Sequence, residues 1–396
     1  MQAALTDTPV VLVNGARQTG KSRLTERISS EHRGRYLTLD DPTQLAAARA
    51  DPVSFLATAQ DALLVIDEVQ KAPDLFGAIK RSVDRDRRPG RFLLTGSADV
   101  LTLPRAAESL AGRMEILSLQ PLAQGEIADR PPSFIERVFA NQPEPLLGPA
   151  VPAVTNMVTV GGFPEVQSRP APDRRRAWFD AYVASITQRD IRDRANIADA
   201  TALPRLLQLI AARSGALVNV AELARASGIP QVTLHRYLAL LESSFLFQPL
   251  SAWHANLGKR LIKAPKAYLL DSGLACALTG AADPATVQAA PHFGGLLETW
   301  VLGELRREAV ALPNPPRIYH YRSAGGVEVD FVIEDAAGRV AAVEVKATRS
   351  LGDKHFNGLR DLEAALGERF RCGVVLYAGE DKVRFGERVW GVGVVG

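Results

Sequence analysis

The stretch VVLVNGARQTGKSRL, residues Val10–Leu24, passes from an apolar run into a loop of glycine and small polar residues, and then into a helix-forming segment. Residues 15–22 fit the phosphate-loop pattern of glycine, four residues, glycine, lysine and serine or threonine. The strand, loop and helix signals stand in the order that this pattern requires, so an ordinary glycine turn before a helix is the weaker interpretation. The stretch therefore predicts a phosphate-binding loop in an α/β domain.

Each residue type in this loop has a chemical reason to be there. The two glycines let the backbone bend so that its N–H groups converge on phosphate oxygens, and the helix that follows adds positive charge at its amino end. Lys21 would reach the outer phosphates of a nucleotide, and the Ser22 hydroxyl would ligate Mg²⁺. The expected nucleotide contacts of the loop are Gly15, Ala16, Arg17, Gln18, Thr19, Gly20, Lys21 and Ser22.

A phosphate loop requires a second, acidic element, which the stretch DALLVIDEVQ at residues 61–70 supplies. Four apolar residues precede Asp67 and Glu68. Asp67 would hold the metal through water, and Glu68 would orient or deprotonate the attacking water. The alternative, a strand that ends in solvated acids, is weak because ligands of open α/β sheets bind at the carboxyl ends of the strands.

The rest of the amino-terminal third alternates between two kinds of pattern. Strand-like runs recur at 35–42, 91–99 and 113–119, and helical patterns lie between them at Pro42–Leu56 and Pro73–Val83. This alternation predicts a parallel sheet with helices on both faces.

Polar residues beside these runs extend the candidate nucleotide site. Thr95 and Ser97 stand at a strand end, where one of them would read the γ-phosphate or the water; a helix cap is an equal alternative for Ser97. Arg113 precedes an apolar strand and would stabilise phosphate charge within its own chain or in a neighbouring copy. A surface arginine is the alternative there, and a homo-oligomer is a candidate assembly.

Several motifs together resemble a known family. The order of NGARQTGKS, LDDP, VIDEVQKAP, LLTGS, LAGR, LQPL and GGFPEV is similar to that of prokaryotic ATPases in which an AAA-type nucleotide domain precedes a C-terminal domain of unknown function. The resemblance covers nearly the whole chain. It implies an ATPase core that uses ATP and Mg²⁺, a helical middle part and a nuclease-like end.

The middle of the chain shows helix-turn-helix spacing over Leu217–Glu242, because the first helix would end at SGIP and a second would begin at Gln231. Two following runs, 245–253 and 258–271, would be the strands of a wing. The second helix would present side chains suited to phosphates or base edges, namely Gln231, Thr233, His235 and Arg236. A structural lid, or a surface for contacting other domains, is the alternative.

A hairpin is expected near the carboxyl end, where two alternating runs flank the sequence DAAG at 335–338. A three-residue loop with glycine in the left-handed position is a preferred hairpin connection. That register places Asp330 across from Glu344 and Glu328 across from Lys346. Period two puts these four side chains on one face. The other, buried face would carry Val327, Val329, Phe331, Val343 and Val345.

The polar face of this hairpin suits phosphodiester chemistry. Asp330 and Glu344 would bind a divalent metal, Lys346 would position or activate water, and Glu298 could reach in from the preceding helix. The arrangement resembles the PD-(D/E)XK nuclease core. The alternative is a charge-paired face in which Glu328 pairs with Lys346.

Length and pattern together predict several domains for this chain of 396 residues. The expected class is α/β, with a P-loop parallel-sheet domain in 1–140. A helical, winged-helix-like part in 153–280 and a C-terminal α/β nuclease-like domain in 288–396 follow.

Composition narrows the class of protein. The net charge of +3 is too small to indicate nucleic-acid binding by itself. No apolar stretch approaches the roughly 20 residues of a membrane span, and the two cysteines, Cys276 and Cys372, have no metal or disulfide spacing. We expect a cytoplasmic, Mg-dependent ATPase coupled to a nuclease-like, DNA-interacting domain. The alternative is a nucleotide-switched interaction or DNA-binding regulatory protein without nuclease activity.

Overall fold

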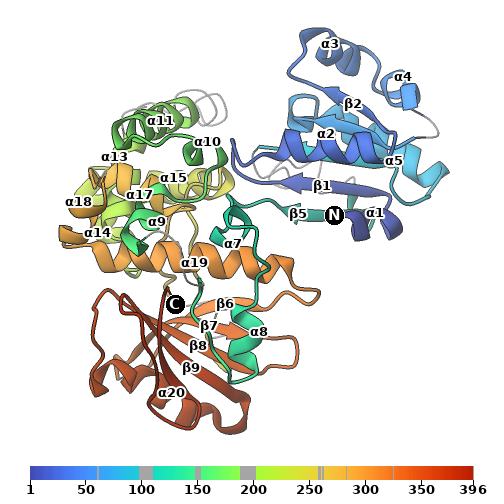
Figure 1. Cartoon of the computed structure of the whole chain (residues 1–396). Helices are drawn as coiled ribbons and strands as arrows, with labels where there is room; N and C mark the ends of the chain where they lie inside the picture. Colours follow the sequence, from blue (N-terminus) through green and yellow to red (C-terminus); the bar gives the residue numbers. More distant parts are fainter. Residues whose placement is uncertain are drawn as a thin grey trace. The chain divides into compact units, whose positions relative to one another are not determined.

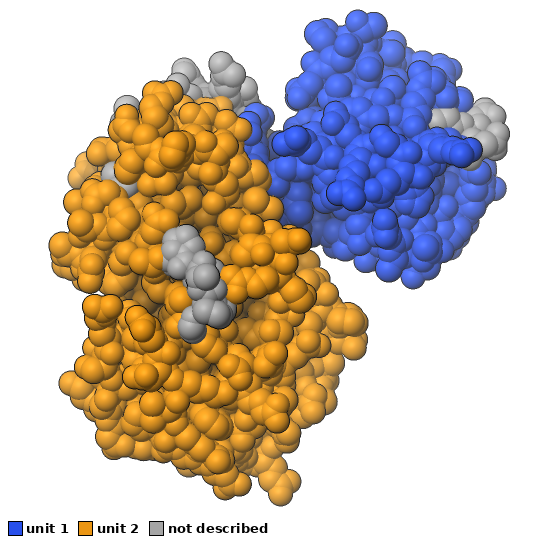
Figure 2. Space-filling model, in the orientation of Figure 1, with its two compact units in different colours: residues 1–121, 243–245 blue, residues 122–242, 246–396 orange. Residues whose placement is uncertain are grey.

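The computed structural model contains two compact units (Figure 2), which are described separately. One comprises residues 1–121 with 243–245, and the other comprises 122–242 with 246–396. The structure describes residues 1–59, 62–97, 110–147, 153–187, 202–256, 260, 263–281, 283–323 and 325–395.

The first unit is built on a five-stranded sheet of order β2-β3-β4-β1-β5, in which every paired strand is parallel to its neighbour. The strands are β1 (Val10–Asn14), β2 (Arg35–Thr38), β3 (Leu64–Asp67), β4 (Phe92–Gly96) and β5 (Met114–Ser118). The helices are α1 (Gln2–Asp7), α2 (Lys21–Glu31), α3 (Pro42–Ala50), α4 (Pro52–Leu56) and α5 (Asp74–Arg85). The predicted parallel α/β sheet is confirmed.

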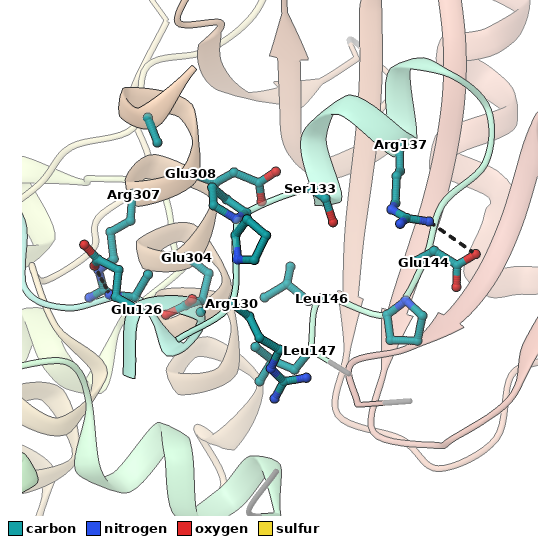
Figure 3. Close-up of a pocket in the computed structure, with 16 residues that line it drawn as sticks. Glu126, Arg130, Ser133, Arg137, Glu144, Leu146, Leu147, Glu304, Arg307 and Glu308 are labelled. Carbon is teal, nitrogen blue, oxygen red and sulfur yellow. Dashed lines mark hydrogen bonds and ion pairs between the residues drawn. The ribbon is translucent and has the colours of Figure 1, made fainter. Parts of the chain in front are cut away.

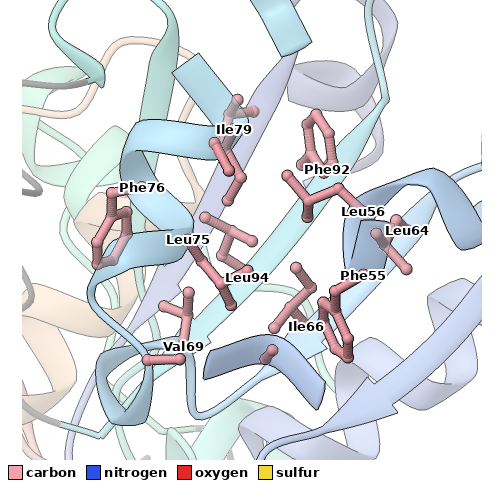
Figure 4. Close-up of a cluster of buried hydrophobic side chains, with 14 of the residues drawn as sticks. Phe55, Leu56, Leu64, Ile66, Val69, Leu75, Phe76, Ile79, Phe92 and Leu94 are labelled. Carbon is pink, nitrogen blue, oxygen red and sulfur yellow. The ribbon is translucent and has the colours of Figure 1, made fainter. Parts of the chain in front are cut away.

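Alternation along β1 explains why helices cover both faces of this sheet. Val10 and Leu12 belong to a buried cluster with side chains of α3, α4 and α5, which Figure 4 shows in part. Val11 and Val13 belong to a second cluster with side chains of α1 and α2. Because successive strand residues point to opposite faces, an entirely apolar strand requires cover on both sides.

The helical pattern predicted for Pro42–Leu56 is two helices in the structure. Asp51 ends α3 and caps α4, because its carboxylate accepts hydrogen bonds from the backbone N–H groups of Val53 and Ser54. Pro52 lacks an N–H and occupies the first position of α4, where no donor is needed.

The second unit begins with helices (Figure 1). They are α7 (Gln124–Ile127), α8 (Phe134–Phe139), α9 (Val154–Val160), α10 (Pro164–Gln167), α11 (Pro172–Ser185), α13 (Ala202–Ala212), α14 (Val220–Ser227), α15 (Gln231–Ser243), α17 (Ser272–Thr279), α18 (Pro284–Ala289) and α19 (Phe293–Ala311). Apart from residues 243–245, the structure thus places the described residues of the predicted parts 153–280 and 288–396 in one compact unit.

A mixed six-stranded sheet of order β10-β11-β9-β8-β7-β6 completes this unit. Its strands are β6 (Arg317–Arg322), β7 (Glu328–Glu334), β8 (Val340–Lys346), β9 (Phe370–Tyr377), β10 (Lys382–Arg384) and β11 (Val389–Gly393). In Figure 1 the sheet lies between α19 and α20 (Asn357–Leu366). Among the described residues, no helix combines the length and apolar character that a membrane crossing needs.

Candidate functional site

The loop between β1 and α2 has the geometry of a phosphate cradle. Gly15 is required there because a Cβ atom at this position would lie 2.3 Å from the carbonyl oxygen of Leu119. Gly20 adopts a left-handed conformation, φ 95°, directly before α2. Between them, Ala16 and Thr19 are buried, and the Thr19 hydroxyl donates to the Ala16 carbonyl at 2.9 Å. Arg17 is half-buried and Gln18 is exposed.

Lys21 folds into this loop. Its Nζ donates to the carbonyl oxygens of Gly15, at 3.0 Å, and Ala16, at 2.7 Å. Burial lowers the pKa of the Lys21 ammonium to about 8, although the nearby carboxylates of Glu68 and Asp67 act in the opposite direction. The ammonium group of Lys21 therefore donates to two neutral carbonyl oxygens of the loop. Oxygens of an anionic ligand would accept stronger hydrogen bonds and replace them.

Ser22 and Asp67, the predicted magnesium ligands, meet across the carboxyl edge of the sheet. The Ser22 hydroxyl lies 3.1 Å and 3.0 Å from the two carboxylate oxygens of Asp67. The Thr95 hydroxyl also donates to Asp67, and it accepts the backbone N–H of Glu68 at 3.0 Å. All these groups offer oxygen, the ligand that Mg²⁺ prefers, so the donor set fits this metal.

Two residues of β2 beside this carboxylate were not predicted. The Thr38 hydroxyl is 3.4 Å from the Asp67 carboxylate. The pKa of the Tyr36 phenol is raised, first by burial and then by the charge of Asp67. The parallel register, with Thr38 paired to Asp67, brings β2 to the site. The signal available in the sequence was the polar end of the run RYLTLDD.

Glu68 is held in place by two side chains. Its carboxylate accepts hydrogen bonds from the Ser97 hydroxyl, at 2.9 Å, and from the Gln70 amide. The backbone of Glu68 is left-handed, with φ 59° and ψ 42°, which is strained for a residue with a Cβ. Gln70 lies on the 3₁₀ turn η2 (Val69–Lys71) and was missed by the sequence reasoning, although it is only two residues from Glu68.

Arg113 lies at the amino ends of the strands of this sheet, opposite the end that carries the phosphate loop. It directly precedes Met114, which pairs with Val10 at the amino end of β1. Its Nε donates to the Asp84 carboxylate at 2.7 Å. The expectation that Arg113 acts on phosphate within its own chain is therefore wrong, because the phosphate loop follows the carboxyl end of β1. Only the expectation of a role toward a neighbouring copy stays a prediction.

The middle of the chain contains the expected pair of helices. Gly228, with φ 74°, ends α14, and α15 follows two residues later. On α15, Gln231, His235 and Arg236 are exposed and Thr233 is half-buried. Two extended segments come next and bridge each other in antiparallel fashion at Phe247–Leu269 and Leu250–Lys266.

The C-terminal hairpin has the predicted register near its loop. Glu334 pairs with Val340, the Asp335 N–H donates to the Arg339 carbonyl at 3.0 Å, and Gly338 is left-handed with φ 75°. The ladder ends at Phe331–Val343. Beyond that pair, the two strands are joined by hydrogen bonds from backbone N–H groups to side-chain carboxylates in place of backbone carbonyls. The Asp330 carboxylate accepts the Val345 N–H at 3.0 Å, and the Glu344 carboxylate accepts the Asp330 N–H at 3.1 Å.

The predicted alternation of faces along β7 is wrong at its centre. One residue of β6, His320, faces two residues of β7 because the register shifts between Tyr319 and Tyr321, which is a β-bulge. Val329 shares a buried cluster with Val332, while Phe331, outside that cluster, packs against Tyr268 with ring centroids 6.1 Å apart. The predicted pair of Glu328 with Lys346 does not form either.

Two lysines contact the carboxylates of this hairpin. Lys346 Nζ lies 2.6 Å from Glu344, while Glu328 pairs with Arg322. Lys266 Nζ, from the extended segment after α15, lies 2.7 Å from Asp330 and 3.6 Å from Glu298 of α19. Sequence reasoning brought Asp330, Glu344, Lys346 and Glu298 together but missed Lys266, because no local pattern connects positions 64 residues apart.

Burial dominates the electrostatics of this cluster. It raises the pKa of Glu298 to about 7 and that of Glu344 to about 8, and the charge of Asp330 adds to both shifts. For Lys266, burial alone would lower the pKa, but the charges of Asp330 and Glu298 raise it overall. The ammonium group of Lys266 is therefore firmly charged.

The carboxylates of this cluster do not fit a divalent metal. Each oxygen of Asp330 and Glu344 already accepts a hydrogen bond from a backbone N–H or a lysine. A divalent metal at Asp330 and Glu344 would therefore have to displace the ammonium groups of Lys266 and Lys346.

A cavity of about 630 Å³ lies beside α19 (Figure 3). Two buried carboxylates of α19 line it and support the segment that wraps the helix: Glu304 accepts the Gln124 N–H at 2.9 Å, and Glu308 accepts the Ile135 N–H at 2.7 Å. Burial raises the pKa of Glu308 to about 7. These contacts give both carboxylates a structural role.

Three family models match consecutive parts of the chain. Residues 7–128 match an AAA domain, 152–285 match a domain of unknown function (DUF8612), and 293–394 match another (DUF4143). A solved structure, the Thermotoga maritima RuvB Holliday junction branch migration motor, is 18% identical with a TM-score of 0.30, over 62% of this chain and 86% of that one. At this TM-score the likeness carries no weight for fold or function.

Relatives occur in several bacteria. A protein of Haemophilus influenzae is 26% identical over 53% of this chain and 50% of its own length. The proteins Mb2031c of Mycobacterium bovis and Rv2008c of Mycobacterium tuberculosis are each 31% identical over 98% of this chain and 81% of their own length. The chain therefore belongs to the same family as these mycobacterial proteins, and its residues 7–128 are an AAA domain.

Proposed function

We propose that the first unit binds ATP with Mg²⁺ and hydrolyses it. The observation that carries this proposal is the contact between Ser22 and Asp67, 3.0 Å apart, beside a lysine buried in a glycine-bent loop. The match of residues 7–128 to an AAA domain supports it. Backbone N–H groups of residues 15–22 would hold the phosphates, and Lys21 would exchange its two carbonyl acceptors for phosphate oxygens.

Ser22 and Asp67 would hold Mg²⁺, Ser22 directly and Asp67 through water. The metal would neutralise charge on the β- and γ-phosphates. Glu68 would accept the proton of the attacking water on the carboxylate that Ser97 and Gln70 orient. Thr95 donates to Asp67 and accepts from the Glu68 backbone, so it would keep the two acids in a fixed relation.

Phosphate release by the purified chain, with ATP and Mg²⁺, tests this proposal. We expect release that stops when Mg²⁺ is chelated and when Asp67 is replaced by alanine. Release that is equal in Asp67→Ala and the parent chain would refute the site.

For the second unit we infer a nucleotide-switched interaction role in place of metal-dependent cleavage, because ammonium groups of Lys266 and Lys346 contact Asp330 and Glu344 where a metal would have to bind. Nuclease activity would require these oxygens for a metal. Incubation of the chain with Mn²⁺ and single- or double-stranded DNA or RNA should leave every substrate intact. Cleavage that Asp330→Ala abolishes would restore the nuclease interpretation.

DNA contact is a second candidate function, favoured by the exposed polar side chains of α15, Gln231, His235 and Arg236. Contacts of this kind to phosphates depend steeply on salt. Arg236→Ala should weaken DNA binding and reduce the salt dependence by about one unit of slope. Binding that is unchanged by this substitution would remove α15 from the interface. A cytoplasmic location and a homo-oligomer in which Arg113 reaches a neighbour stay predictions.

A further inference from the structure

Lys266 approaches the C-terminal carboxylates from outside the hairpin that bears them. Its backbone exchanges hydrogen bonds with Leu250, at 2.9 Å in each direction, so the segment that carries it is fixed. Its side chain is only 4% exposed, and Nζ lies 2.7 Å from Asp330 and 3.6 Å from Glu298. An ammonium group thus lies between a carboxylate of β7 and a carboxylate of α19.

We propose that Lys266 is the built-in cation of this cluster: its ammonium group lies between Asp330 and Glu298, where a divalent metal shared by these two carboxylates would lie, and it joins the extended segment after α15 to the C-terminal sheet. This proposal does not rest on the ATPase function of the first unit. It assigns the cluster a structural, metal-free role.

Each oxygen of the two hairpin carboxylates, Asp330 and Glu344, accepts a hydrogen bond from the protein itself. Asp330 gives one oxygen to Lys266 and the other to the Val345 N–H, and Glu344 gives one to Lys346 and the other to the Asp330 N–H. A divalent ion takes about six oxygen ligands. It would have to break both lysine contacts and still compete with two backbone donors.

The two lysines differ in how easily they can leave. The Lys346 side chain is 32% exposed, so it can turn into solvent. Lys266 is enclosed, and its backbone bonds with Leu250 prevent the segment from withdrawing. An ammonium group that stays buried after losing its carboxylate partner is strongly unfavourable. Lys266, more than Lys346, therefore closes the cluster to metals.

Mn²⁺ titration of the full chain, followed by electron paramagnetic resonance without nucleotide, tests the proposal. Asp67→Ala is present in every variant to remove the other candidate metal site. This chain should bind no Mn²⁺ at the C-terminal cluster. Adding Lys266→Ala should create one site, and adding Asp330→Asn as well should remove it. Lys263→Ala, on the same segment but bonded only to a carbonyl in the described contacts, is the matched control and should create no site.

Either of two Mn²⁺ results would overturn the proposal. One is Mn²⁺ binding by the Asp67→Ala chain that Asp330→Asn abolishes. The other is a folded Lys266→Ala chain that gains no site. If Lys266→Ala does not fold, thermal unfolding decides: Lys266→Met should lower the midpoint, and Lys266→Met with Asp330→Asn should regain most of the loss because the carboxylate nearest to Lys266 is then neutral. No recovery in the double variant would also overturn it.

Discussion

Asp67 and Asp330 are buried to a similar extent, 3% and 6% exposed, yet their neighbours differ in kind. Asp67 meets hydroxyl groups of Ser22 and Thr95. Asp330 meets the ammonium group of Lys266. A hydroxyl is neutral, keeps two lone pairs and can turn to ligate a metal beside the carboxylate, whereas an ammonium group has no lone pair and repels a cation. The difference in metal binding that we propose for the two acids follows from these partners.

The largest effect is expected from a substitution at Glu68. If this substitution had no effect on turnover, the contrast between the Asp67 site and the Asp330 site would fail. Glu68→Gln keeps the shape of the side chain but cannot accept a proton, so turnover should fall about 10²- to 10⁴-fold while ATP affinity is kept. Steady-state phosphate release and equilibrium binding of ATP measure the two quantities. Glu328→Gln, an exposed glutamate of the second unit, is the control, and turnover of Glu68→Gln equal to the parent rate would contradict this role.

Lys21→Ala comes next in size. Two charge-assisted hydrogen bonds to phosphate contribute about 1.5–3 kcal/mol each, so ATP affinity should fall about 100-fold or more. Isothermal titration with ATP and Mg²⁺ measures this loss. Lys71→Ala, whose partner is the carboxylate of Asp40, should bind ATP as the parent does; an equal loss in both variants would point to a general charge effect.

Gln70→Ala tests how Glu68 is oriented, and we expect a smaller effect on turnover than from Glu68→Gln. Gln70 contacts the Glu68 carboxylate without reaching the phosphates, so it is a positioning residue. We expect kcat to fall about tenfold, the size of losing one hydrogen bond of about 1–1.5 kcal/mol, with KM unchanged. A rise in KM at constant kcat would instead place Gln70 in nucleotide binding.

The last prediction concerns stability in place of activity, at a buried carboxylate that has neither a metal nor a lysine partner. Burial raises the pKa of Glu308 to about 7 in the folded chain. This group therefore stabilises the fold fully below its unfolded pKa of about 4.3, and the contribution, at most about 4 kcal/mol, is lost as pH rises toward 7. Glu308→Gln should flatten urea stability between pH 5 and 8, whereas Glu387→Gln, on an exposed loop, should not; equal slopes in the two variants would contradict the shift.

The local sequence predicted most of the candidate site of the first unit, because the polar residues of this site directly follow the ends of apolar strands. Val10–Asn14 and Leu64–Asp67 are apolar runs that end at the sheet's carboxyl edge, so a parallel sheet brings Ser22 and Asp67 together. Arg113 shows the limit of this reasoning. Its neighbours in sequence resemble a functional arginine, but the strand that follows it starts at the amino edge, and only the sheet's direction reveals this.

The second unit shows why the remaining features could not be predicted. The hairpin loop at 336–338 was accessible, because three residues and a left-handed glycine fix its register. The bulge opposite His320 and the contact of Lys266 with Asp330 could not be predicted. Both depend on contacts between distant segments, and each changes the chemistry of Asp330 without leaving a signal in the residues around it.

The most direct test of the comparison counts Mn²⁺ ions bound to the whole chain in the presence of a non-hydrolysable ATP analogue. We predict one ion per chain, lost in Asp67→Ala and retained in Asp330→Asn. A second ion that disappears in Asp330→Asn, or a single ion that survives Asp67→Ala, would contradict the assignment of the open site to Asp67 and the closed one to Asp330.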